Sequence, residues 1–145
     1  MSVLLLEYAG LFLWSFLAAT LLPLSSEAPL ALLVRTHGQV FVPVLVATAG
    51  NYLGACTTYW VGRRAALALG NRHKPATTAQ EDSRAARLLR RYGQPVLVLS
   101  WVPVVGDALV ALAGAMRLPF GAFSFWVILG KCLRYLAVAW AVSAV

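Results

Sequence analysis

Two acidic residues lie inside otherwise apolar stretches, and each follows a proline by four positions. Glu27 follows Pro23, and Asp107 follows Pro103. A carboxylate at the centre of a bilayer costs roughly 2.5 to 3.5 kcal/mol even on lenient insertion scales, so an acid in such a stretch is by default a hypothesis about a functional site. We therefore expect a membrane protein with a polar centre built around Glu27 and Asp107.

The residues beside each acid favour a break in the helix and a site for a proton or an ion. Two hydroxyls precede Glu27, and a glycine directly precedes Asp107. Prolines free backbone groups that must then be shielded from lipid by protein. We predict re-entrant breaks at Pro23, Ser26, Pro103 and Gly106. The alternative for Glu27 is a structural acid that only caps its helix.

Two cations in the last apolar stretch are candidate partners for these acids. Lys131 and Arg134 are spaced i, i+3 and lie too deep to reach the interface easily, so each carries a penalty unless it is paired. We predict a buried cluster of Glu27 or Asp107 with Lys131 and Arg134. Exposure of Arg134 to a water pocket is the alternative.

Asn51 is a further candidate for binding substrate or protons, because it is a polar group between Gly50 and Gly54 in an apolar stretch. Small residues at such spacing also serve helix packing, so that alternative stays open. The histidines and cysteines are isolated and lack the spacing of metal ligands, so we expect no metal and no cofactor. These residues are His37, His73, Cys56 and Cys132.

Hydrolytic chemistry is not favoured. Intramembrane aspartyl proteolysis needs two opposed aspartates, and the only aspartate besides Asp107 is Asp82, in a polar connection. The chain also has no nucleophile elbow and no zinc-binding histidine pair. We therefore predict that the protein is not an enzyme, although headgroup transfer by the acid pair stays open.

The elements that position these residues must be transmembrane helices. The chain has 145 residues, of which 61% are hydrophobic and 12% are charged, against about 25% charged in soluble domains. Stretches 40–61 and 119–143 are long enough to span a bilayer. Residues 1–22 are expected to be retained, because Glu7 stands where a secretory signal has positive charge. A simpler topology, in which 3–22 and 95–116 each cross fully, would give four spans.

One polar connection sets the orientation. It holds eight of the twelve basic residues, and the positive-inside rule places it in the cytoplasm. Within it, Thr78 and Glu81 form a capping box, and apolar residues recur at helical spacing up to Gly93. We predict a basic amphipathic helix that lies along the inner leaflet with its apolar stripe toward the lipid.

The chain also resembles itself at an offset of 80 residues. Pro23, Glu27 and Gly50 then fall on a proline, an acid and a glycine, and Asn51 falls on Lys131. We predict an all-α integral membrane protein, one membrane domain over 1–145, with repeat one at 1–62, the basic connection at 63–93 and repeat two at 94–145. Each repeat is a re-entrant broken-helix hairpin plus a transmembrane helix, and the cytoplasmic connection makes the repeats inverted. Glu27 and Asp107 would then meet near the midplane.

Three runs of residues carry a resemblance to a known family. They are Pro23 to Glu27, Ser100 to Asp107, and Gly130, Lys131, Arg134 and Tyr135 of the last span. Over nearly its whole length the chain resembles the small YqaA-like branch of the DedA family, within the VTT-domain (SNARE-associated) membrane proteins. Larger DedA proteins carry arginines on both sides of the second-hairpin proline, where this chain has Ser100 and Gly106, so Lys131 and Arg134 would take over the cationic role.

The resemblance implies a multi-pass protein of the inner membrane that handles lipids. It implies a transporter or lipid flippase that acts on an anionic lipid or lipid-carrier headgroup. Coupling of this transport to the proton-motive force is one form of the hypothesis. The expected partners are membrane phospholipids or a polyprenyl-phosphate lipid, protons and a second copy of the chain, but no nucleic acid. The alternative is a non-transporting scaffold or assembly subunit whose buried ion pairs are structural.

Overall fold

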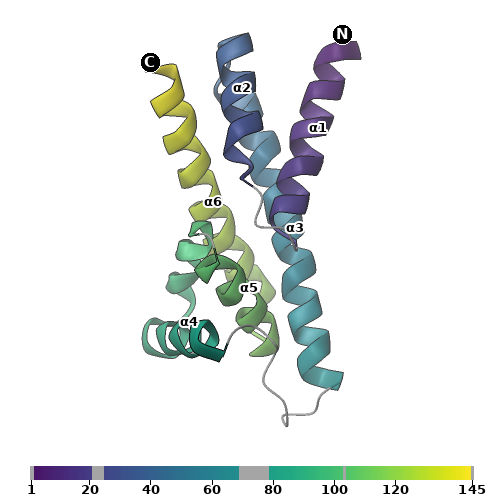
Figure 1. The fold of residues 1–145 in the computed structure, drawn as a ribbon. Coiled ribbons are helices and arrows are strands. Elements are labelled where there is room, and N and C mark those ends of the chain that lie inside the picture. The colour runs from purple at the N-terminus through teal and green to yellow at the C-terminus, as the bar shows by residue number, and fades with distance from the viewer. Residues whose placement is uncertain (1, 21–24, 69–78, 103, 145) are drawn as a thin grey trace. The chain divides into compact units, whose positions relative to one another are not determined.

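The computed structural model is all-helical over the residues that it describes, which are 2–20, 25–68, 79–102 and 104–144 (Figure 1). Pro23, Pro103 and Thr78 lie outside these residues, so the structure does not test the breaks predicted at the two prolines or the capping threonine. The elements in chain order are α1 (Ser2–Ala18), α2 (Glu27–His37), α3 (Phe41–Ala68), α4 (Ala79–Tyr92), the 3₁₀ helix η1 (Gln94–Trp101), α5 (Val105–Ala115) and α6 (Phe120–Ser143).

Helices α3 and α6 are the two candidate membrane spans in the described part of the chain. They have 28 and 24 residues and are apolar enough to cross a bilayer. At a rise of about 1.5 Å per residue, even the shorter one exceeds the hydrocarbon core of about 30 Å. The two stretches predicted to span are therefore confirmed as helices long and apolar enough to do so, and α3 continues past residue 61 to Ala68.

The other apolar segments are short. Helices α2 and α5 have 11 residues each and η1 has 8, so each covers roughly 16 Å, about half of the hydrocarbon core. Segment 95–116 is not one crossing helix, because it is divided into η1 and α5, which pack against each other. Val104 has a φ of 68° in the turn between them. The simpler topology with a full crossing at 95–116 is therefore wrong.

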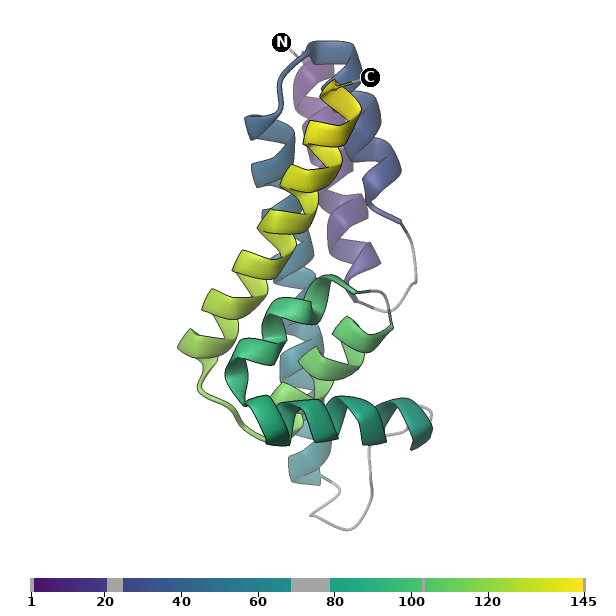
Figure 2. The same ribbon diagram turned by 90° about the vertical axis from the view of Figure 1, so that its left-hand side faces the viewer.

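The chain divides into two compact units, Met1–Gly54 with Lys131–Val145, and Ala55–Gly130. The first unit holds α1, α2, the start of α3 and the end of α6. Its core includes Leu11 of α1, Leu30 of α2, Val44 of α3 and Tyr135 of α6. The start of α1 and the ends of α2 and α6 lie at the same end of this unit (Figures 1 and 2).

The second unit contains the predicted amphipathic helix. Helix α4 forms as expected and ends at Tyr92, before Gly93, which has a φ of 71°. Ala85 and Leu89 of its apolar stripe are buried, at 1% and 3% exposure, because α4 packs against η1 and α5 (Figure 2). Tyr92 of the same stripe is 58% exposed. The expected contact of the stripe with lipid is thus wrong for Ala85 and Leu89, which contact protein. Its exposed basic face is formed by Arg84, Arg87, Arg90 and Arg91.

Glycines bring α3 against the backbone of α1 in the first unit. A Cβ added at Gly50 or Gly54 would lie 2.4 Å from the carbonyl oxygen of Phe12 or Phe16, respectively. Such close approach is typical of small-xxx-small contacts between membrane helices. In the second unit, a Cβ added at Gly130 would lie 2.2 Å from the Val98 oxygen of η1. The glycines at the repeated positions 50 and 130 therefore each bring a long helix against the backbone of another segment, α1 for Gly50 and η1 for Gly130.

The substitution Gly50→Ala is expected to destabilise the protein by about 1 to 3 kcal/mol, because overpacking forces the backbones of α3 and α1 apart. Thermal unfolding followed by circular dichroism in detergent measures this effect. The matched control is Gly10→Ala, since a Cβ at Gly10 meets no atom within 4 Å. Equal melting temperatures for the two variants would contradict the close packing.

Candidate functional site

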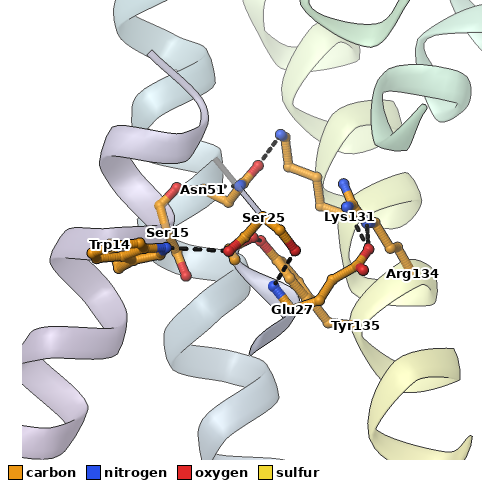
Figure 3. A network of polar contacts seen from close by, with 9 residues as sticks. Trp14, Ser15, Ser25, Glu27, Asn51, Lys131, Arg134 and Tyr135 are labelled. Atoms are coloured by element: carbon orange, nitrogen blue, oxygen red, sulfur yellow. Dashed lines mark hydrogen bonds and ion pairs between the residues drawn. The ribbon is translucent and has the colours of Figure 1, made fainter. Parts of the chain in front are cut away.

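The start of α2 is held by polar contacts of Glu27, the first residue of that helix, and of the two serines before it (Figure 3). The indole Nε1 of Trp14 donates to the carbonyl oxygen of Ser25 at 3.2 Å, and the backbone N–H of Glu27 donates to Ser25 Oγ at 3.4 Å. Ser26 Oγ and the Tyr135 hydroxyl lie 2.5 Å apart. Helix N-termini also favour negative charge, which suits an acid at this position.

Glu27 forms an ion pair with Arg134 of α6. The guanidinium Nε and Nη2 of Arg134 both donate to Glu27 Oε1, at 2.9 and 2.5 Å. The Arg134 side chain is 21% exposed and that of Glu27 41%. Charge-assisted bonds of this kind are stronger than neutral ones. The ion pair therefore connects the start of α2 to α6, and its carboxylate remains partly exposed.

Lys131 lies one helical turn before Arg134 and is only 5% exposed. Its Nζ donates to Asn51 Oδ1, and Asn51 Nδ2 donates to the carbonyl oxygen of Ser15 at 3.1 Å. A buried ammonium needs acceptors, because its transfer out of water is costly without them. The Asn51 amide thus joins α6 to α1 and supplies an acceptor to Lys131 (Figure 3).

The cluster combines two cations with one carboxylate, so the formal charges of Glu27, Lys131 and Arg134 sum to +1. Arginine binds carboxylate or phosphate through its planar fork, and lysine acts as a compact point charge. With the hydroxyls of Ser26 and Tyr135 nearby, the arrangement suits an oxyanion or a proton.

Four of the predicted site residues lie together in the first unit: Glu27, Asn51, Lys131 and Arg134. Asp107 belongs to the second unit, where it is exposed in the first turn of α5. The prediction that it meets Glu27 stays a prediction. Gly106 is buried before it, and a Cβ there would lie 2.3 Å from the Ser100 oxygen.

The residue patterns predict no role for Ser15 or Tyr135. A signal existed for Tyr135, because a tyrosine in the middle of a span, away from the interfaces, needs a partner for its hydroxyl when buried; its exposure is 1%. Ser15 offered no such signal, since it contributes a backbone oxygen that any residue has. The described residues include no group of three or more histidines, cysteines or acids that could hold a metal ion.

Comparison with known proteins gives consistent matches. The VTT domain family model matches residues 22–144. Inner membrane protein YqaA of Escherichia coli strain K12 is 45% identical over 135 residues, which cover 92% of this chain and 89% of the relative. The protein of that name from Shigella flexneri matches equally. An uncharacterized protein of Haemophilus influenzae is 39% identical over 136 residues, covering 88% of this chain and 82% of its own length. No solved structure matches significantly.

The contact between Asn51 and Lys131 is expected to appear as coupling in a double-mutant cycle. Asn51→Leu should lower the free energy of unfolding by about 1.5 to 3 kcal/mol, because a hydrogen bond to a charged group is lost. In a Lys131→Met background the same change should have a much smaller effect. Unfolding in detergent, followed by circular dichroism, measures the three variants.

The matched control for this cycle combines Asn51→Leu with Arg117→Met, because Arg117 is exposed in the second unit. These two effects should add within about 0.5 kcal/mol, as for distant sites. If the Asn51 and Lys131 effects add equally well, the contact carries no energy.

Proposed function

The chain belongs to the DedA family of VTT-domain proteins, as a protein of the inner membrane, and from this premise we propose that it is a transporter or flippase for an anionic lipid headgroup. One observation carries the proposal: Lys131 is buried one turn from Arg134, inside a membrane-spanning helix and beside the start of a helix too short to cross. Ionised groups within membrane segments are rare and mark substrate or ion pathways.

The proposed binding step is an exchange of partners at Arg134. In the structure the Arg134 guanidinium donates two hydrogen bonds to Glu27 Oε1. A phosphate offers the same planar fork a bidentate acceptor, so a headgroup competes with Glu27 for Arg134. Lys131 adds a second positive charge on the same side of α6 and stabilises the bound anion.

Protonation of Glu27 provides the coupling in this scheme. A neutral carboxyl no longer holds Arg134 by charge, so proton uptake frees the guanidinium for the anionic headgroup. Loss of the proton restores the ion pair and releases the headgroup. The proton gradient across the inner membrane then gives the cycle a direction. No covalent bond of the lipid changes, so the proposed protein is not an enzyme.

Two inverted repeats are part of this proposal. Two residues at the same position of two inverted repeats come close to each other only if they lie near the axis that relates the repeats. Lys131 and Asn51 are such a pair at the offset of 80 residues, and Lys131 donates a hydrogen bond to Asn51. The glycines at the equivalent positions 50 and 130 also each lie against a backbone carbonyl group in their own unit. These observations support the pairing of the two repeats, and at the same offset Asp107 is the counterpart of Glu27.

A second candidate function is that of a non-transporting scaffold or assembly subunit. It is favoured by the pairing of the charges inside the chain, since Glu27 has Arg134 and Lys131 has Asn51. Buried polar groups can serve only to fix the register of packed helices. In that case the partner is a second copy of the chain or another membrane protein, and Arg134 stays paired with Glu27 throughout.

Glu27→Gln separates the two candidates. If the protein is a transporter, this neutral variant should lose at least tenfold in the rate of anionic-lipid translocation, because an amide cannot alternate between charged and neutral forms. The assay uses proteoliposomes with fluorescent phosphatidylglycerol or a polyprenyl phosphate, with and without a pH gradient. The melting temperature of the variant is measured in parallel.

The matched control is Glu81→Gln, the same chemical change in α4 of the second unit, which should translocate as the wild type does. Translocation by Glu27→Gln at the wild-type rate would overturn the proposed role of the acid. A wild-type protein that moves neither lipid, while Glu27→Gln melts at a lower temperature, would favour the scaffold.

A further inference from the structure

Four exposed arginines of α4 form a basic face that the proposed function does not use. They are Arg84, Arg87, Arg90 and Arg91. With 3.6 residues per turn, Arg87 lies opposite the buried pair of Ala85 and Leu89, and the other three arginines lie on either side of it. The basic face of α4 therefore points away from the segments that cover its apolar stripe.

At Arg84 and Arg91, the charge of this face is not neutralised by any other described side chain. These two residues are seven positions apart, so they lie on the same side of the helix, about two turns from each other. Arg87 and Arg91 are spaced i, i+4, where like charges destabilise a helix. An external anion that binds beside these guanidinium groups relieves their repulsion.

The direction of α4 places this face along a membrane surface. In the second unit, α4 runs across the parts of α3 and α6 that belong to the same unit (Figures 1 and 2). Because α3 and α6 are the candidate membrane spans, a helix that runs across them lies along the bilayer. Only Gly93 separates the end of α4 from the apolar segment η1, so this end lies at the edge of the membrane.

Two exposed rings of this unit are typical of the membrane–water interface, where tyrosine and tryptophan are enriched. Tyr92 at the end of α4 is 58% exposed, and the Arg91 guanidinium lies 5.4 Å from the centre of its ring. Trp60 of α3 is 47% exposed, and the Arg63 guanidinium lies 5.3 Å from its ring centre. With 28 residues, α3 is also about 12 Å longer than the hydrocarbon core, so it reaches the headgroups.

The side of α4 that carries the arginines faces the surroundings of the protein. Ala85 and Leu89 are buried because α4 packs against η1 and α5, and α4 lies on the periphery of these two segments (Figure 2). At the level of the interface, the surroundings are lipid headgroups. The positive-inside rule makes this interface the cytoplasmic one, and the cytoplasmic leaflet has a negative surface potential.

We propose that the basic face of α4 binds the phosphate groups of anionic phospholipids in the cytoplasmic leaflet. Arginine presents a planar fork of donors that matches a phosphate group, and basic clusters on amphipathic helices are typical of anionic-lipid binding. Because α4 packs against η1 and α5, bound headgroups also hold these two segments at the cytoplasmic side. The proposal does not rest on the proposed function, since the cluster of Glu27, Lys131 and Arg134 belongs to the first unit.

A soluble acidic protein is the alternative occupant of a basic face. Lipid is favoured because the face ends at an exposed tyrosine, which suits an interface better than water. Lipid is also favoured because α4 continues after one residue into the apolar segment η1, which leaves no linker that could carry the helix away from the membrane.

Native mass spectrometry of the full chain tests the lipid. Protein in detergent is titrated with phosphatidylglycerol or phosphatidylcholine, and retained lipids beyond the first are counted, because the cluster at Arg134 can hold one headgroup. The wild type should retain phosphatidylglycerol at least fivefold better than phosphatidylcholine, and Arg84→Gln with Arg91→Gln should lower this ratio below twofold. Arg87 is kept, because it also interacts within the protein.

The matched control is Arg35→Gln with Arg117→Gln, which removes the same charge from two exposed arginines outside α4. This control should keep the wild-type preference, and an equal loss in it would overturn the proposal, because only net charge would then matter. A wild type that does not distinguish the two lipids would overturn it as well. Displacement of phosphatidylglycerol by polyglutamate at equal charge would assign the face to a soluble acidic partner instead. Melting temperatures show whether each variant is folded.

Hydrogen exchange in nanodiscs tests whether bound headgroups hold η1 and α5. The amides of these segments should exchange at least threefold more slowly in phosphatidylglycerol than in phosphatidylcholine, and Arg84→Gln with Arg91→Gln should remove the difference. The amides of α1, in the first unit, serve as the internal reference and should exchange equally in both lipids. Equal exchange of η1 and α5 in the two lipids by the wild type would refute this part of the proposal.

Discussion

Hydrocarbon solvates neither charges nor free backbone groups, and this constraint determines the first unit of the protein. Helix α2 begins inside an apolar chain, so its first N–H groups and its acid must find partners from protein. Arg134 binds the acid, and Tyr135 lies in hydrogen-bonding contact with the serine before it. The ion pair between Glu27 and Arg134 is therefore the interaction on which the short helix depends.

The same groups are the candidates for function, and this creates a conflict between stability and activity. A cation that is held permanently by Glu27 is unable to bind a headgroup, and a cation without any partner is costly in the membrane. The cluster resolves the conflict if protonation alternates the partners of Arg134. Lys131 is buried and keeps Asn51 as an acceptor, so only one of the two cations must change its partner.

Much of this arrangement could be predicted from residue types alone. The lengths of two apolar stretches fixed the spans, and the charges at Glu27, Lys131 and Arg134 required partners, which the structure supplies within one unit. The partner of the α4 stripe could not be predicted, because an apolar face at helical spacing suits lipid and protein equally. The hydrogen bond from Asn51 to the backbone oxygen of Ser15 could not be predicted either. Sequence patterns show which side chains are present, but not which carbonyl groups the fold places next to them. The approach of Asp107 to Glu27 stays a prediction.

The most direct test of the central claim is a double-mutant cycle of Glu27→Gln and Arg134→Gln, with thermal unfolding as the measurement. If the two ions stabilise each other, each single variant melts below the wild type, because it leaves one charge without its partner. The double variant then recovers most of the loss, because it leaves neither charge without a partner. Effects that add within about 0.5 kcal/mol would show that the two residues are independent and would contradict the account.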